Sequence, residues 1–178
     1  MKKILSRIRL ISILLFVLFP LLFSCDQSPP ESIFPENAPC RYEVRGRLDG
    51  FEIIGTLFFD EDGSIRFLHQ KENTPLFGME EAFRDGRLFV SYRGLSWDSD
   101  EADTSFYKLF CVLDDFRRQS EAPLPAEKID GKELCAKKIP FRDGEVTLFF
   151  NKKGLTPYKM IAGARELELE LFFFDPAS

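Results

Sequence analysis

The chain has 178 residues, with 24 basic and 29 acidic side chains and a formal net charge of −5 at pH 7. Four of the basic residues and none of the acidic ones lie within residues 1–24, so the chain from residue 25 onward carries a net charge of −9. Such an acidic chain is a poor partner for a phosphate backbone, and no Lys/Arg cluster offsets the charge, so we predict no nucleic-acid binding. The remaining 154 residues suit one domain with a real core.

Residues 1–24 have the layout of a bacterial export signal. A basic start, MKKILSRIR, leads into the interrupted apolar run LISILLFVLFPLLF, which is too short to be a comfortable membrane span. The run ends in LFSC, residues 22–25, which resembles the lipobox of bacterial lipoproteins. This resemblance implies cleavage before Cys25 and attachment of a diacylglyceryl group to it. We therefore expect an exported protein anchored by lipid, on the outer face of the cytoplasmic membrane or the periplasmic face of the outer membrane.

Residues 25–39, CDQSPPESIFPENAP, predict a tether between this anchor and the folded part. The segment contains four prolines and shows almost no apolar periodicity. Proline-rich chains are extended and semi-rigid, so at roughly 3.1 Å per residue the tether spans roughly 40 Å. A single folded domain is then predicted over residues 40–178.

Strands dominate the first half of that domain. RYEVRGRL, FEIIGTLFF and SIRFLHQK have apolar residues at a period of two, and Asp49-Gly50 and the DEDG segment at 60–63 favour tight reversals, which predicts an antiparallel meander. Residues 73–83, NTPLFGMEEAF, are predicted as a turn with one helical turn, because Gly78 weakens a helix. Residues 87–97, RLFVSYRGLSW, are predicted as one further strand.

Residues 106–118, FYKLFCVLDDFRR, predict a long helix. Asp103 or Thr104 can accept hydrogen bonds from the first helical turn, and two arginines at the end suit the negative pole of the helix dipole. Its single apolar face needs a sheet to pack against. The apolar residues at helical spacing are Phe106, Leu109, Phe110, Leu113 and Phe116.

Four more strands are predicted after a proline-rich link, SEAPLPAEKIDG, at 120–131. Their sequences are ELCAKKIPF, EVTLFF, PYKMIA and ELELELFFFD, and turn-forming residues separate them. With roughly eight strands and one long helix, we predict a mainly β fold. The expected architecture is a large curved antiparallel sheet or half-barrel covered by the helix.

The sequence contains no recognisable catalytic or metal-binding pattern, so neither an enzyme nor a cofactor is predicted. His69 is the only histidine, and we interpret it as lying at the solvent-exposed end of a strand. Asp98, Asp100 and Asp103 resemble the start of a calcium loop, but the glycine and glutamate that such a loop requires are missing. They are interpreted as residues that precede a helix.

Three cysteines remain after Cys25, namely Cys40, Cys111 and Cys135. An odd number of cysteines in an exported protein leaves at least one thiol unpaired, and the spacings match no metal-binding signature. We expect at most one disulfide and otherwise buried thiols.

Phenylalanine is the unusual feature of the composition, with 17 of the 20 in the chain following residue 24. In FEIIGTLFF apolar residues lie on both faces of the strand, which indicates that both faces are covered. Two explanations stay open here: a curved sheet that closes on itself with a packed interior, or an apolar cavity that accepts a hydrophobic ligand. The residues predicted to contact such a ligand are Phe51, Ile53, Leu57, Phe59, Ile65, Phe67, Leu167, Leu169, Leu171 and Phe173.

The last part of the chain resembles a known family. EVTLFF, a turn and LTPYKMIAGARELELELFFFD are similar to the final hairpins of the LolA-like half-barrel superfamily, which includes the carrier and receptor of outer-membrane lipoproteins and the LppX-type lipoproteins. The resemblance implies a curved antiparallel sheet with helices in its concavity and an apolar pocket for acyl chains.

Two functions follow from these observations. The first is an envelope lipoprotein that is not an enzyme and that binds or carries a hydrophobic ligand such as acyl chains. The alternative is a structural or interaction lipoprotein with a fully packed core, whose surface docks an envelope protein. Whether the interior is filled or hollow distinguishes the two.

Overall fold

In the computed structural model the described residues are 39–99, 103–118, 124–129, 131–151 and 156–174. The predicted signal peptide, Cys25 and all of the tether except Pro39 lie outside them, so lipidation and the domain boundaries stay predictions. None of the described helical residues form a helix that is long and apolar enough to cross a membrane.

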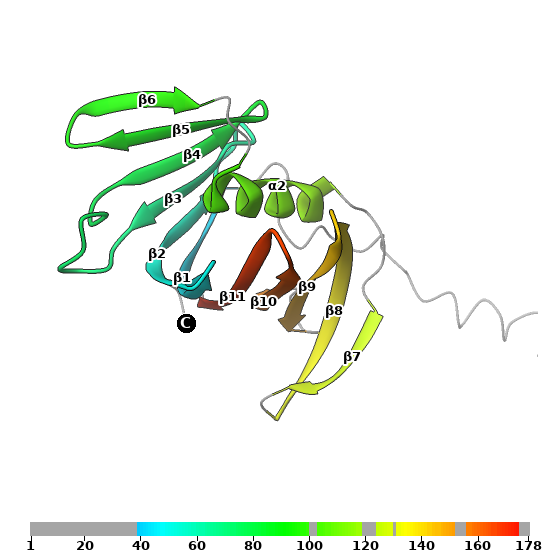
Figure 1. Cartoon of the computed structure of the whole chain (residues 1–178). Coiled ribbons are helices and arrows are strands. Elements are labelled where there is room, and N and C mark those ends of the chain that lie inside the picture. The colour runs from blue at the N-terminus through cyan, green and yellow to red at the C-terminus, as the bar shows by residue number, and fades with distance from the viewer. Residues whose placement is uncertain (1–38, 100–102, 119–123, 130, 152–155, 175–178) are drawn as a thin grey trace, which may run out of the picture. The chain divides into compact units, whose positions relative to one another are not determined.

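Eleven antiparallel strands form one open sheet (Figure 1). Their order is β6-β5-β4-β3-β2-β1-β11-β10-β9-β8-β7, so β1 pairs with β11 in the middle, and β6 and β7 are the two edges. This confirms the predicted mainly β fold with a large antiparallel sheet. The strands are β1 (Cys40–Leu48), β2 (Phe51–Phe59), β3 (Ile65–His69), β4 (Glu80–Arg84), β5 (Arg87–Tyr92), β6 (Leu95–Ser99), β7 (Leu124–Ile129), β8 (Lys132–Phe141), β9 (Gly144–Asn151), β10 (Pro157–Ala164) and β11 (Leu167–Phe174).

The helix α2 (Ser105–Arg118) lies in the concavity of the sheet and links its two edges in sequence. The chain leaves the sheet at the β6 edge, runs along the concave face as α2 and returns at β7 on the opposite edge (Figure 1). α2 contacts β4 on one side and β8 and β11 on the other. A helix of 14 residues is about 21 Å long, so it covers the middle of the concave face and leaves the β2–β6 end partly open.

Alternate residues of the strands point into the concavity and form the core with α2. In β11, for example, Leu167, Leu169, Leu171 and Phe173 are buried and the glutamates between them are exposed. These side chains exclude water from beneath the helix, and the buried apolar area is the main stabilising contribution of this layer. The buried apolar residues of the helix face are Leu109, Phe110, Val112, Leu113 and Phe116, none more than 1% exposed.

Polar contacts fix the start of α2. The hydroxyl oxygen of Thr104 accepts a hydrogen bond from the Tyr107 backbone N–H at 3.1 Å. Of the two predicted caps, Thr104 is therefore one that the structure uses. The Ser105 hydroxyl donates to Asp49 in the β1–β2 turn, and this carboxylate also accepts from the Glu168 N–H at 2.8 Å. The start of the helix is thereby tied to both halves of the sheet.

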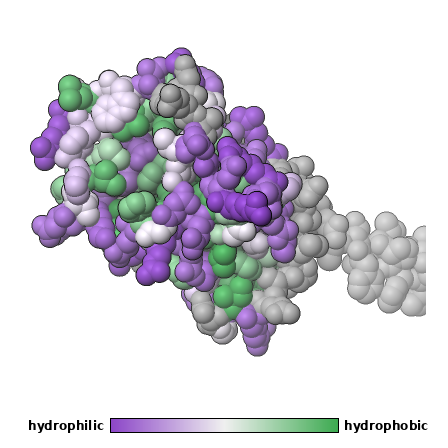
Figure 2. Space-filling model, viewed as in Figure 1, coloured by the Kyte–Doolittle hydropathy of each residue, from purple (hydrophilic) through white to green (hydrophobic). Residues whose placement is uncertain are grey.

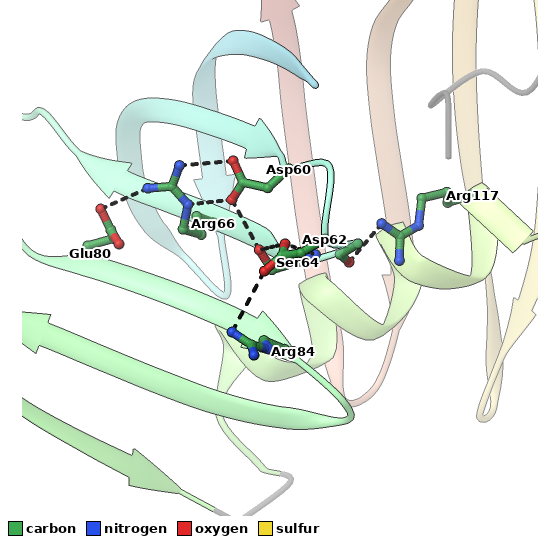
Figure 3. Close-up of polar contacts among 8 residues, drawn as sticks. Asp60, Asp62, Ser64, Arg66, Glu80, Arg84 and Arg117 are labelled. Carbon is green, nitrogen blue, oxygen red and sulfur yellow. Dashed lines mark hydrogen bonds and ion pairs between the residues drawn. The ribbon is translucent and has the colours of Figure 1, made fainter. Parts of the chain in front are cut away.

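The other end of α2 is tied to the β2–β3 turn. Arg117 donates to the Gly63 carbonyl at 2.8 Å (Figure 3). It also donates to Asp114 at 2.7 Å, and its side chain is only 10% exposed. Asp114 also pairs with Arg118 at 2.7 Å, but that arginine is 70% exposed. The two predicted C-terminal arginines therefore have different roles, since only the buried one reaches the sheet.

On the convex face, long basic side chains lie over outward-pointing aromatic rings. Phe58 and Phe172 point outward and are half-buried, with Arg66 at 4.9 Å from the first ring and Lys159 at 4.7 Å from the second. Apolar stems of Lys and Arg shield such rings while their charges stay in water. The two-sided apolar pattern of β2 therefore does not reflect a sheet that closes on itself. That explanation is wrong, because the sheet is open, with β6 and β7 at its two ends.

The sheet has eleven strands where roughly eight were predicted. Residues 87–97 form a hairpin, not one strand, because Arg93 and Gly94 both adopt positive φ and reverse the chain. Within the segment 73–83 the turn is present, but it leads into β4 and contains no helix. The proline-rich link contains β7, whose Pro125 is tolerated because β7 is an edge strand.

Candidate functional site: an apolar cleft

An open cleft of about 550 Å³ lies on the concave face beside the start of α2. Its walls come from β1, β2, β4, β5 and β6, from the segment between β3 and β4, and from the first residues of the helix. We refer to it as the cleft. It is lined by Leu48, Phe51, Glu52, Ile53, Lys71, Thr74, Pro75, Leu76, Met79, Glu81, Leu88, Val90, Trp97, Thr104, Ser105 and Phe106.

Large apolar side chains remain exposed around the mouth of the cleft. Phe51 is 74% exposed, Leu76 42% and Trp97 49%. They come from the start of β2, the β3–β4 segment and the edge strand β6. Figure 2 shows hydrophobic side chains among polar ones over the β2–β6 end of this face. Contiguous exposed apolar residues around a concavity are typical of binding sites.

The β3–β4 segment, residues 70–79, is a compact turn that forms one wall. The Thr74 hydroxyl donates to the Lys71 carbonyl at 2.8 Å, and the Met79 N–H donates to the Leu76 carbonyl at 2.8 Å. The segment is tied to the end of β3, where the Gly78 N–H donates to the His69 carbonyl at 2.9 Å. These backbone contacts hold Leu76 and Met79 on the wall of the cleft, and Gly78 supplies the positive φ that the turn requires.

A buried polar pair lies at the inner wall of the cleft. His69 Nε2 is 3.0 Å from Glu81 Oε1, and the two side chains are only 4% and 7% exposed. The imidazole is 4.9 Å from the Phe67 ring and 5.0 Å from the Phe106 ring, centroid to centroid. His69 is therefore buried and paired with a carboxyl group. The interpretation of it as a histidine at the solvent-exposed end of a strand is wrong.

A second ion pair lies at the rim. Lys71 Nζ is 2.5 Å from Glu52 Oε2, and the two side chains are 35% and 57% exposed. The hydrogen bond from Lys71 lowers the pKa of the Glu52 carboxyl below its ordinary value. Because water screens this pair, it contributes little stability, and either partner can be released to a ligand at low cost.

All ten residues predicted to contact a ligand point to the concave face, but they differ in access. Phe51 and Ile53 line the cleft. The other eight are buried core residues, and their role in binding stays a prediction. Sequence reasoning did not identify Leu76, Met79, Glu81 or Trp97 as site residues, since the first three lie in a segment predicted as a turn and Trp97 ends a predicted strand whose hairpin was not recognised. The eight buried core residues among the ten predicted ones are Leu57, Phe59, Ile65, Phe67, Leu167, Leu169, Leu171 and Phe173, each at most 4% exposed.

A larger depression of about 910 Å³ lies over the opposite ends of β2–β5, and its lining is mainly charged. Arg66 pairs with Asp60 at 2.5 Å and with Glu80 at 3.3 Å, and Arg84 pairs with Asp62 at 3.7 Å (Figure 3). Its arginines thus have acidic partners within the depression or beside it, which leaves little unsatisfied charge for a ligand. The smaller, apolar cleft is therefore the better candidate site.

Metal and thiol chemistry find no support in the described ranges. No group of three or more His, Cys, Asp or Glu residues among them could hold a metal ion. Asp98 forms an ion pair with Arg87 at 2.6 Å, and Asp100 lies outside the described residues. The three cysteines Cys40, Cys111 and Cys135 are free thiols, and burial raises the pKa of the first two, which makes them less reactive.

Comparison with known proteins adds a likeness in fold. No protein-family model matches the chain, and no curated protein matches it in sequence. An uncharacterized conserved protein from Thermus thermophilus is similar with a TM-score of 0.51 and 11% identity, over 78% of this chain and 79% of that one. At this identity the likeness shows a shared fold and carries nothing about function.

Two further solved structures are similar at lower scores. LprF from Mycobacterium bovis has a TM-score of 0.41 and 11% identity, over 80% of this chain and 88% of that one. A LolA superfamily protein from Nitrosomonas europaea has a TM-score of 0.38 and 10% identity, over 83% and 90%. Both scores are too low to carry an argument, so the functional case rests on the cleft.

Proposed function

We propose that the protein is a lipid-anchored lipoprotein of the bacterial envelope that binds or carries a hydrophobic ligand, such as an acyl chain, in the cleft. The observation that carries this proposal is the cleft itself, an apolar concavity left open where α2 does not cover the sheet. Its volume of about 550 Å³ lies within the range of about 300–1,000 Å³ of small-molecule sites. The resemblance of the sequence to the LolA-like superfamily agrees with this ligand class.

The energetics favour an alkyl chain over a polar solute. Transfer of each methylene from water into an apolar site contributes about 0.8 kcal/mol, so ten methylenes give a gross gain of about 8 kcal/mol. Loss of translational and rotational freedom offsets part of this gain. Exposed Phe51 and Trp97 at the mouth also gain from being covered. An alkyl chain therefore suits the cleft better than a polar solute does.

Co-purification tests the ligand directly. Residues 26–178 are produced in bacteria, shown to unfold cooperatively on heating, and extracted with organic solvent for mass spectrometry. We expect a lipid at near-stoichiometric amount, or saturable binding of a fluorescent fatty acid or an apolar dye. A folded protein with no lipid and no binding of either probe would contradict the proposal. It would favour the alternative, an interaction lipoprotein without a ligand that docks an envelope protein.

The anchor is tested separately on the full chain. Cleavage before Cys25 with diacylation of its sulfur predicts a mass that lacks residues 1–24 and carries the lipid. Thiol titration in denaturant with reductant should then count three reactive cysteines, since the thioether blocks Cys25 and leaves Cys40, Cys111 and Cys135. Four reactive thiols, or an uncleaved chain, would refute lipidation and leave the cleft unaffected.

A further inference from the structure

Three charged residues line the cleft, and only one of them is buried. The side chains of Glu52 and Lys71 are 57% and 35% exposed, and they pair with each other at the rim. The side chain of Glu81 is 7% exposed and lies on β4, the strand that carries the inner wall. A carboxyl group in an apolar recess is expensive to bury without partners, so its environment is informative.

One oxygen of Glu81 has a partner and the other does not. Oε1 is 3.0 Å from His69 Nε2, and within the described part of the chain this is the only side-chain interaction of Glu81. Among the described residues, no fully buried side-chain nitrogen or oxygen lacks a hydrogen-bond partner. Oε2 therefore keeps accessible surface, and because Glu81 lines the cleft, that surface opens into it.

His69 holds the carboxyl group in this position. Its ring lies between Phe67 at 4.9 Å and Phe106 at 5.0 Å, so it has little room to rotate. Its backbone N–H donates to the Met79 carbonyl at 2.9 Å, which fixes the end of β3 against the wall of the cleft. The open oxygen of Glu81 is thus a preorganised acceptor, and preorganisation reduces the entropy lost on binding.

We propose that this open oxygen is a head-group subsite, so that the ligand is an amphiphile whose polar head donates a hydrogen bond, as an ammonium or a hydroxyl group does. This inference rests on the proposed function, since the alkyl part of the ligand fills the cleft. A charged donor forms the stronger bond to a carboxylate, and in an apolar recess the bond gains further strength. A ligand headed by a carboxylate has no hydrogen to donate to this oxygen and would bring its own acceptor atoms against it, which disfavours it.

The start of α2 acts against this preference, because it favours an anionic head group. The first residues of α2, Ser105 and Phe106, also line it, and the N-terminus of a helix attracts anions. Part of this end is already occupied by acceptors. The Thr104 hydroxyl oxygen accepts from the Tyr107 N–H, and the Asp49 carboxylate accepts from the Ser105 hydroxyl. The relative attraction of a head group to the Glu81 oxygen and to the N-terminus of α2 decides which charge is preferred, and this preference can be measured.

The experiment compares the binding of different head groups by the full chain, without substitutions, in lipid nanodiscs. Three photoreactive alkyl probes of equal length, ending in an amine, a hydroxyl or a carboxylate, are crosslinked in turn. The labelling of cleft peptides is divided by the labelling of the nanodisc belt protein, which corrects for partition into lipid. We expect the amine to exceed the carboxylate about tenfold, the ratio that a charge-assisted hydrogen bond provides, with the hydroxyl between them.

Two variants locate the preference. Glu81→Gln keeps the size and an acceptor but removes the charge, and it should reduce the amine-to-carboxylate ratio about tenfold. Glu170→Gln is the control, since the Glu170 side chain is 52% exposed and is not part of the cleft, and it should leave the ratio unchanged within about twofold. Thermal unfolding of both variants checks that they fold.

The outcomes separate the two proposals. Equal labelling by all three probes, or a preference for the carboxylate, would overturn the head-group subsite and leave the proposed function standing, because the cleft still binds alkyl chains. Unaltered selectivity in a folded Glu81→Gln variant would do the same. Labelling of the cleft by none of the probes would overturn both. The first comparison needs no variant, so a substitution that fails to fold does not prevent the test.

Discussion

The concave face of the sheet has two regions that differ in what covers them. Beneath α2, Phe110 and Phe116 are fully buried against inward-facing residues of both halves of the sheet. At the β2–β6 end, beyond the start of the helix, Phe51 and Trp97 are 74% and 49% exposed around the cleft. The strands of both regions present apolar residues to the inside.

The difference shows that the helix, rather than the strands, determines where the interior is filled. α2 begins at Ser105. Beyond this residue the β3–β4 segment and β6 form walls of the cleft, but they do not cover its opening. A sheet of eleven strands offers more inner surface than one helix of 14 residues can cover. The uncovered remainder is what we propose as the ligand site, and each prediction below tests this division.

The largest effect is expected for a matched pair of phenylalanines, one from each region. Phe110→Ala should lower the free energy of unfolding by about 3–5 kcal/mol, because it removes a fully buried ring and leaves a cavity. Phe51→Ala should change it by at most about 0.5 kcal/mol, as expected for an exposed site. Urea unfolding of both variants measures the difference. Equal losses would show that the two regions do not differ in packing.

The buried arginine at the end of α2 should give the next largest effect. Arg117→Met removes the hydrogen bonds to the Gly63 carbonyl and to Asp114, so it should cost about 1.5–3 kcal/mol. Arg118→Met is the control, since its partner is the same carboxylate but its side chain is 70% exposed, and we expect about 0–1 kcal/mol.

Ligand binding distinguishes this contact from the cleft. The Arg117 contact lies at the end of the helix away from the cleft, so Arg117→Met should leave the affinity for an apolar dye unchanged while it lowers stability. A loss of affinity as large as the loss of stability would mean that the helix-covered region and the cleft are one cooperative unit. Dye titration at a temperature where the variant is folded provides the measurement.

A smaller effect, on binding alone, is expected at the mouth of the cleft. Trp97→Ser should weaken the binding of an alkyl ligand about tenfold, because roughly 50 Å² of apolar contact is lost. Phe174→Ser is the control, since this ring is 46% exposed but is not part of the cleft. Both variants should keep the melting temperature of the parent within a few degrees. Equal affinities for the two variants would exclude the cleft as the binding site.

Much of the fold could be predicted because local signals were strong. Asp49-Gly50 and Asp85-Gly86 form hairpin turns with both residues at positive φ, as their sequences indicate. The three missed strands have weak signals for physical reasons. In β4 the inward-facing Glu81 breaks the apolar period, in β6 the preceding turn is formed by Arg93 and Gly94, and β7 contains a proline.

The cleft could be predicted only in part. The apolar inner faces of the strands could be recognised, and all ten predicted residues lie on the concave side of the sheet. Whether a residue is covered depends on where α2 begins and on the β3–β4 segment, which are tertiary properties. The pairing of His69 with Glu81 likewise depends on the register of β3 with β4, in which Phe67 is opposite Glu81, and this register was not available from sequence.

The smallest effect concerns pH and the β2–β3 turn to which α2 is tied. Hydrogen bonds from the Arg66 guanidinium hold the pKa of the Asp60 carboxyl below its ordinary value. The folded state therefore favours the carboxylate, so the stabilisation is complete above the unfolded pKa of about 3.9 and is lost as the pH falls through the lower folded pKa. Because the pair is partly exposed, the contribution should be about 1 kcal/mol or less.

Two substitutions isolate this contribution from the rest of the acid titration. In Asp60→Asn the free energy of unfolding should decrease less than in the parent protein between about pH 5 and about pH 2.5, a range that spans the unfolded pKa of the carboxyl. Arg66→Met should remove most of the same part of the slope, because the Ser64 hydroxyl also donates to Asp60, at 3.1 Å. The double variant should add little to Asp60→Asn, since both members of the pair are already lost. Additive effects would mean that Arg66 and Asp60 stabilise the fold independently of each other. The acid dependence would then belong to the sheet as a whole and not to the turn that holds the covered region in place.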